Sequence, residues 1–295
     1  MFARPGLPSF DYLRAATAGQ VVELLQEHGA EARLLMGGTD LFPGLREGRL
    51  RPRLVVDVKG VPGLREVCYA PEDGLTVGAA VTMNELVRHP DVRAHYPLLA
   101  LAAGSVASYQ IRNRATIGGN LCNASPCADT SPAALVLEAS LNLHGPGGER
   151  RVPAGEFFLG PGRTVLQAGE FLTAIHFPPP RPGAVARYRK LGRCRSGDLS
   201  LVAVALLAYA DGTPSGYEFR LGLGSVAPTP IRAREAEAHL ASQPAGEESL
   251  VRAAELARAA SSPITDVRAT AAYQRDMVRN LALRELRAAW QALQE

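Results

Sequence analysis

Two glycine pairs, each flanked by hydrogen-bonding side chains, are the residues in this sequence best suited to hold a ligand. The first glycine loop is residues 36–40 (MGGTD), and the second glycine loop is residues 116–120 (TIGGN). Glycine lets the backbone approach a ligand closely and exposes N–H groups to an anion such as a pyrophosphate. Two such loops could hold the two phosphates of one dinucleotide. Each pair alone is also typical of an ordinary turn, because Asn, Ser and Asp close loops on their own backbone.

Two weaker motifs compete with this interpretation. Residues 222–227 (GLGSVA) match the GxGxxA form of the dinucleotide-binding fingerprint, but Pro228 and Pro230 stand where its helix would begin. Cys122 and Cys127 have part of a plant-type iron–sulfur spacing without its C-x2-C continuation. We therefore expect neither a nicotinamide site nor an iron–sulfur cluster in these segments. No CxxC pair is present either, and we expect no structural disulfide.

Hydrolytic and metal-centred catalysis find no support in the sequence. The chain contains no Walker A loop, HExxH helix or G-x-S-x-G elbow, and its six histidines are scattered. An organic cofactor that carries its own chemistry needs only binding and orientation from the protein, which suits a chain without an evident acid, base or nucleophile. The net charge of +3 over 295 residues also excludes nucleic acid as the default partner.

The order of apolar runs and turn residues predicts an α+β protein. A short helix is expected after Thr17, ending at Gly29, and the aperiodic segment 111–132 is expected to be a loop system. Strands are expected at residues 33–38, 53–58, 65–70, 75–80, 170–177, 200–210 and 217–223, and further helices at 82–89, 98–108, 247–260 and 267–294.

The proline-rich segment 178–183 is the expected domain boundary. It predicts an N-terminal domain over residues 1–180, in two lobes of about 1–60 and 61–180, and a C-terminal α+β domain over residues 184–295. Prolines interrupt the apolar residues near the N-terminus, and the longest apolar run, residues 201–210, is too short to span a bilayer. We therefore expect a cytoplasmic protein with no membrane span.

Four segments resemble a known family, the FAD-binding medium subunits of the molybdenum hydroxylases. These enzymes include xanthine dehydrogenase, aerobic carbon monoxide dehydrogenase and 4-hydroxybenzoyl-CoA reductase. The segments are residues 34–41 (LLMGGTDL), 111–132 (IRNRATIGGNLCNASPCADTSP), 188–193 (YRKLGR) and 221–233 (LGLGSVAPTPIRA). The resemblance implies a two-lobed FAD-binding domain of the vanillyl-alcohol-oxidase (PCMH) type, followed by a smaller α+β domain of the CO dehydrogenase flavoprotein C-terminal type.

The resemblance also implies which residues bind FAD. They are Leu34, Leu35, Met36, Gly37, Gly38, Thr39, Asp40, Leu41, Ala107, Thr116, Gly118, Gly119, Asn120, Asn123, Asp129, Leu172 and Lys190. Gly37, Gly38 and Thr39 would lie at the phosphates, and Tyr188 is a candidate for stacking on the flavin ring. No catalytic side chain and no metal ligand is implied. The cysteine-rich insertion that holds a [4Fe–4S] cluster in the reductase is missing here.

The function that the resemblance implies is electron transfer within a heterotrimer. FAD in this chain would take electrons from two [2Fe–2S] clusters of a small subunit, while a large molybdopterin subunit oxidises the substrate. The external acceptor would be NAD, a quinone, ferredoxin or oxygen, and the complex a dimer of heterotrimers. Two alternatives stay open: a flavin-free scaffold subunit of such a complex, and a stand-alone flavin oxidase.

Overall fold

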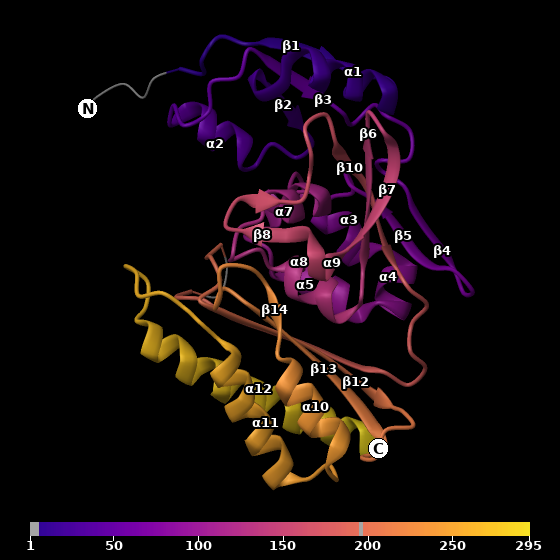
Figure 1. Cartoon of the computed structure of the whole chain (residues 1–295), viewed down its shortest axis with the longest axis vertical. Helices are drawn as coiled ribbons and strands as arrows, with labels where there is room; N and C mark the ends of the chain where they lie inside the picture. Colours follow the sequence, from indigo (N-terminus) through magenta and orange to yellow (C-terminus); the bar gives the residue numbers. More distant parts are fainter. Residues whose placement is uncertain (1–5, 195–196) are drawn as a thin grey trace.

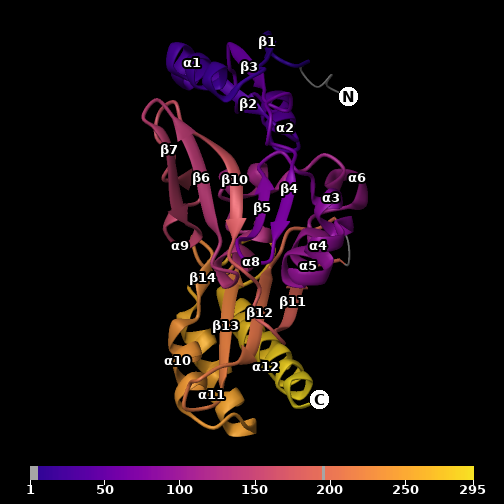
Figure 2. The same cartoon turned by 90° about the vertical axis from the view of Figure 1, so that its right-hand side faces the viewer.

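The computed structural model describes residues 6–194 and 197–295. Figures 1 and 2 show three layers of structure stacked along the long axis of the molecule, with the N-terminal elements at one end and the C-terminal helices at the other. The layer at the N-terminal end is a small parallel sheet in the order β1-β3-β2, with β1 at Asp11–Arg14, β2 at Ala32–Leu35 and β3 at Leu54–Asp57.

Helix α1 (Ala18–His28) forms as its sequence predicts. The Thr17 side chain accepts a hydrogen bond from the backbone of Gln20 (3.1 Å), and Gly29 ends the helix with a φ of 50°. The helix buries Val21 and Val22. A second helix in this layer, α2 (Leu41–Arg46), follows the first glycine loop.

The central layer is an antiparallel sheet in the order β4-β5-β10-β6-β7. Its strands are β4 (Val67–Ala70), β5 (Gly74–Gly78), β6 (Ser140–Gly145), β7 (Gly148–Pro153) and β10 (Phe171–Phe177). Alternate residues of β6 are buried, because one face of the strand covers the core. The shorter elements here are α3 (Met83–Arg88), α4 (Pro90–His95), α5 (Pro97–Ser105), α9 (Ala154–Phe157), β8 (Phe158–Gly160) and β9 (Arg163–Thr164).

The expected loop system at residues 111–132 is wrong in part, because short helices occupy much of it. These are α6 (Tyr109–Arg112), α7 (Ile117–Cys122) and α8 (Thr130–Val136). Helices of four to seven residues are too short to show the periodicity that predicts a helix. Ser108 and Thr116 cap the first two with their side chains. The expected helix over 98–108 ends earlier, at Ser105, and Ala107 has a φ of 41°.

The layer at the C-terminal end is an antiparallel sheet in the order β11-β12-β13-β14, covered on one face by three helices. The strands are β11 (Val185–Leu191), β12 (Val202–Ala210), β13 (Tyr217–Gly224) and β14 (Ile231–Arg232), and the helices are α10 (Arg234–Ser242), α11 (Glu247–Ala260) and α12 (Ala271–Gln294). The helix expected over 267–294 begins later, at Ala271, because the Thr270 side chain caps it by accepting a hydrogen bond from Tyr273 N–H (3.2 Å).

Strand β12 explains the long apolar run at residues 201–210. Val204 and Leu206 pack with the C-terminal helices, whereas Ala205 and Leu207 pack with α5 and α8 of the central layer. A strand buried on both faces has no polar alternation. This second interface joins the central layer to the C-terminal sheet, and Pro178–Gly183 connects them along the chain.

The glycines of residues 222–227 are explained by packing. A Cβ on Gly222 would lie 2.7 Å from the Pro132 carbonyl oxygen, and one on Gly224 would lie 2.7 Å from the Pro132 ring. These glycines let α8 lie against β13, and β14 follows rather than a helix. Among the described residues, no helix is both long and apolar enough to cross a membrane.

Candidate cofactor site

The first glycine loop leaves β2 and packs against the residues that lead into the second glycine loop. A Cβ on Gly37 would lie 2.1 Å from the Arg114 carbonyl oxygen and 3.2 Å from the Ala115 Cα. Only glycine permits this approach, because the clash would be with backbone rather than with a movable side chain. The structure therefore brings the two glycine loops together, although roughly 80 residues separate them in sequence.

The first glycine loop presents a run of free hydrogen-bond donors. Within the described part of the chain, the backbone N–H groups of Gly37, Gly38, Thr39 and Asp40 donate to no protein acceptor. Gly38 has a φ of 75°, which favours glycine. Consecutive free N–H groups in a turn form a concave site for an anion. The loop thus fits a phosphate or pyrophosphate group.

The second glycine loop is built differently. Thr116 caps α7 by accepting a hydrogen bond from Gly119 N–H (3.2 Å), and the N–H groups of Ile117 and Gly118 donate to the carbonyls of Val81 (3.0 Å) and Ala79 (2.9 Å). A Cβ on Gly118 would lie 2.6 Å from Ala79, so this glycine serves packing. On Gly119 a Cβ would meet only the Thr116 hydroxyl (2.9 Å), which leaves the rest of that face open to a ligand.

Two asparagines of the second segment have different surroundings. The Asn120 side-chain oxygen accepts a hydrogen bond from the Thr130 hydroxyl (2.6 Å), which ties α7 to the start of α8. Asn123 is exposed at the end of α7, and its side chain makes no hydrogen bond to a described residue. Asn123 is therefore the side chain that is available to a bound molecule.

Asp129 lies in a cluster that joins the central layer to the C-terminal sheet. This Asp129 cluster consists of Asp129, Ser105, Tyr188 and Lys190. The Lys190 ammonium donates to Asp129 Oδ2 (2.8 Å) and to the Ser105 carbonyl (3.0 Å), and the Tyr188 hydroxyl donates to Asp129 Oδ1 (3.2 Å). Asp129 is 5% exposed. Both carboxylate oxygens thus have partners within the protein.

Burial dominates the electrostatics of the Asp129 cluster. It raises the pKa of Asp129 above its usual range, while the Lys190 charge and the hydrogen bonds from Lys190 and Tyr188 partly offset the rise. Burial and the nearby Asp129 charge raise the pKa of Tyr188 well above its usual range. The Tyr188 hydroxyl is committed to Asp129, so the cluster anchors the segment after the second glycine loop to β11.

Three further residues that the resemblance implies, Ala107, Lys190 and Leu172, lie at two places. Ala107 and Lys190 line one cavity of about 500 Å³, together with Arg112 and residues of the segment after β11. Arg112 donates to the carbonyls of Val106 (2.8 Å) and Ala107 (3.2 Å), which supports the positive φ of Ala107. Leu172 lies in β10 and is 1% exposed, so its side chain belongs to the core.

Sequence reasoning missed the supporting residues. Ser105 acts through its backbone carbonyl and Arg112 through bonds to carbonyls, and neither contribution has a signature in sequence. The close contact of Gly37 with Arg114 is equally invisible, because it joins distant segments. In the described ranges 6–194 and 197–295, no group of three metal-ligating side chains is found.

Comparisons with known proteins show the family of the chain. A family model described as the FAD binding domain in molybdopterin dehydrogenase matches residues 8–180, and one described as the CO dehydrogenase flavoprotein C-terminal domain matches residues 165–289. The carbon monoxide dehydrogenase medium chain of Hydrogenophaga pseudoflava is 35% identical over 285 residues, covering 96% of this chain and 98% of the relative. A putative xanthine dehydrogenase FAD-binding subunit of Escherichia coli is 39% identical over 227 residues, 77% of each chain.

Solved structures give the same result. A structure of carbon monoxide dehydrogenase from H. pseudoflava that lacks the Mo-pyranopterin moiety of its cofactor matches with a TM-score of 0.93 at 35% identity, covering 98% of this chain and 99% of that chain. The two family models and the shared fold define the chain as an FAD-binding oxidoreductase component. The chain belongs to the family of FAD-binding medium subunits of molybdenum hydroxylases.

Proposed function

We propose that this chain is the electron-transfer subunit of a heterotrimeric molybdenum hydroxylase. Its FAD would take electrons from [2Fe–2S] clusters of a small subunit and pass them to NAD, a quinone or ferredoxin, while a large molybdopterin subunit oxidises the substrate. The proposal includes a dimer of heterotrimers, a cytoplasmic location and the domain limits 1–180 and 184–295. The observation that carries the flavin role is the run of free N–H groups at residues 37–40, where Gly37 packs against Arg114 and Ala115, the residues that lead into the second glycine loop.

The residues of the two loops would hold the pyrophosphate of FAD. The four free N–H groups of the first loop would donate to phosphate oxygens, and Thr39 would add a hydroxyl donor. The open face of Gly119 would let the backbone approach the cofactor, and Asn123 would donate from its free amide. FAD supplies the one- and two-electron chemistry of its isoalloxazine ring when it is bound.

The Asp129 cluster would act indirectly. Because Lys190 and Tyr188 hold Asp129, the segment between the second glycine loop and α8 keeps a fixed position against β11. Lys190 also lines the 500 Å³ cavity beside Ala107, and polar groups of this cavity would make further contacts with bound FAD. The chain itself then needs no nucleophile, because its task is to bind and orient the cofactor between two partners.

Replacing Gly119 with valine tests the flavin assignment. The branched side chain would occupy the open face of the loop, so we expect loss of most bound flavin. We also expect a modest fall in melting temperature, because the new Cβ lies 2.9 Å from the Thr116 hydroxyl that caps α7. Gly212→Val is the matched control, since a Cβ there meets nothing within 4 Å. The readout is acid-released FAD per chain, by absorbance and chromatography. Full flavin content in Gly119→Val would overturn the loop assignment.

The electron-transfer role needs a separate measurement. We expect the purified chain to carry FAD and to co-purify with a two-cluster iron–sulfur chain and a molybdopterin chain. Stopped-flow reduction of the flavin by substrate should require both partners. A colourless chain that binds no FAD with its partners present would favour the scaffold alternative, and turnover of an organic substrate by the isolated chain would favour the stand-alone oxidase.

A further inference from the structure

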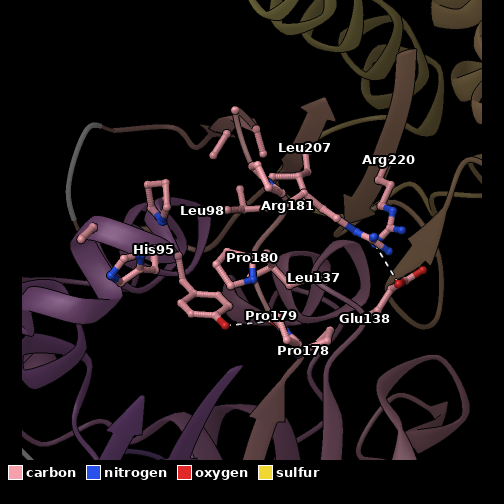
Figure 3. Close-up of a pocket in the computed structure, with 17 residues that line it drawn as sticks. His95, Leu98, Leu137, Glu138, Pro178, Pro179, Pro180, Arg181, Leu207 and Arg220 are labelled. Atoms are coloured by element: carbon pink, nitrogen blue, oxygen red, sulfur yellow. Dashed lines mark hydrogen bonds and ion pairs between the residues drawn. The ribbon is translucent and has the colours of Figure 1, made fainter. Parts of the chain in front are cut away.

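A cavity of about 390 Å³ lies between the central layer and the C-terminal sheet (Figure 3). None of the residues that line it belongs to the two glycine loops. The end of α4, the start of α5 and the linker Pro178–Gly183 form one side of the cavity, and β11 to β13 form the other. Leu98 and Leu207 are buried in its wall, and the linker prolines complete an apolar surface. The Tyr96 hydroxyl holds the linker by donating to the Pro178 carbonyl (2.9 Å).

One end of the cavity is cationic. Figure 3 shows Arg181 and Arg220 extending toward the same end, and each guanidinium lies over the Tyr209 ring, at 5.5 and 5.4 Å from its centroid. Arg220 is 6% exposed and pairs through Nη1 with Glu138 (2.8 Å) and through Nε with Glu218 (2.6 Å). Its Nη2 has no partner among the described residues.

Arg181 is an exposed cation at the edge of this cavity and has no carboxylate partner among the described residues. It forms no ion pair with any described residue, whereas both oxygens of Glu138 are engaged, one by Arg220 (2.8 Å) and the other by Arg232 (3.4 Å). A planar guanidinium binds a carboxylate through two parallel hydrogen bonds. The cavity thus offers a free cation and a free N–H arm beside an apolar wall.

We propose that this cavity binds a small carboxylic acid with an apolar body, such as an arylalkanoate. The carboxylate would take hydrogen bonds from Arg181 and from Nη2 of Arg220, and the apolar body would lie against Leu98, Leu207 and the linker prolines. A pocket of this size at a domain interface, apolar with a few polar groups at one end, is typical of small-molecule sites. Because both layers contribute walls, the bound acid would stabilise their arrangement.

Calorimetric titration of the flavin-loaded chain with 3-phenylpropionate tests the proposal. We expect saturable binding, and binding about tenfold or more weaker in Arg181→Gln, because a hydrogen bond to a charged group is lost. Arg163→Gln is the matched control, an exposed arginine on β9 outside this cavity. The neutral 3-phenylpropanol, which has the same apolar body, should bind more weakly than the acid, and so should inorganic phosphate, which has no apolar body.

A second variant tests the apolar end. Ala186→Phe, on β11 in the cavity wall, should abolish binding of 3-phenylpropionate while flavin content and melting temperature stay near those of the parent chain. The proposal is overturned if the parent chain binds no 3-phenylpropionate at millimolar concentration, if Arg181→Gln binds it as tightly as the parent, or if 3-phenylpropanol binds equally well. If Ala186→Phe fails to fold, two other comparisons still test the proposal: the acid against the alcohol in the parent chain, and the parent chain against Arg181→Gln with the acid.

Discussion

In the first glycine loop four consecutive N–H groups have no acceptor among the described residues, whereas in the second every N–H from Ile117 to Asn120 donates within the protein. The first loop offers donors, and the second offers an open face at Gly119 on a helix that is already capped. The two glycine pairs are similar in sequence but have different roles in the structure. Anchoring differs as well: in the part of the chain that the structure describes, the second loop is followed by a buried ion pair to the C-terminal sheet, Asp129 with Lys190, and the first loop is not.

The largest effect should come from breaking that anchor. Lys190→Met removes the ammonium and keeps most of the apolar stem, which leaves Asp129 buried beside Tyr188 without its cation. Removing one partner of a buried ion pair costs about 3–5 kcal/mol. We expect a loss of that order in the free energy of unfolding by urea at pH 8, together with a lower flavin content.

The stability lost in Lys190→Met should depend on pH. Burial already raises the pKa of Asp129 in the folded chain, and losing Lys190 removes an interaction that lowers it, so the folded pKa rises further. A carboxyl whose pKa is higher in the folded than in the unfolded state loses stability as pH rises through the folded pKa. The deficit of Lys190→Met should therefore shrink as pH falls from 8 toward 5.

A double variant isolates the cause. Asp129→Asn combined with Lys190→Met replaces the charge with a neutral amide, so it should recover part of the stability lost in Lys190→Met alone. If the double variant is no more stable than the single one, or if the deficit is the same at pH 5 and pH 8, the buried charge is not the source of the loss. The anchoring role of the Asp129 cluster would then be wrong.

The next effect concerns the contact between the two loops. Gly37→Ala places a Cβ 2.1 Å from the Arg114 carbonyl oxygen, and the two segments must move apart. Overpacking of this kind costs about 1–3 kcal/mol. We expect that loss in urea unfolding, with a fall in bound FAD because the donors of the first loop shift.

Gly155→Ala is the control for Gly37→Ala, because a Cβ at Gly155 meets nothing within 4 Å. That variant should keep the flavin content and the stability of the parent chain. A Gly37→Ala chain with unchanged stability and full FAD would show that the loops do not depend on their mutual contact.

The sequence predicts the elements with strong local signals. Helix α1 has a cap at Thr17 and a stop at Gly29, and α11 spans the predicted range 247–260. Helices α6 to α8 were not predictable, since their lengths of four to seven residues show no period and their caps stand in a Gly- and Asn-rich segment. The family resemblance implies that the two glycine loops bind the cofactor, but no local pattern shows that Gly37 touches Arg114 or that Asp129 pairs with Lys190.

The smallest effect should come from the cap of α7. Thr116→Val keeps the shape of the side chain but removes the oxygen that accepts from Gly119 N–H (3.2 Å), which costs about 1 kcal/mol. Without its cap, α7 holds Gly119 less firmly at the open face of the second loop, where FAD would lie, so we expect the affinity for FAD to fall by a few fold. Thr17→Val removes an equivalent cap, on α1 in the N-terminal layer (3.1 Å), and should cost similar stability with no change in flavin affinity. Equal flavin affinity in Thr116→Val and Thr17→Val would mean that the second loop positions the cofactor without help from its cap. The contribution of the second loop to FAD binding would then depend on Gly119 alone.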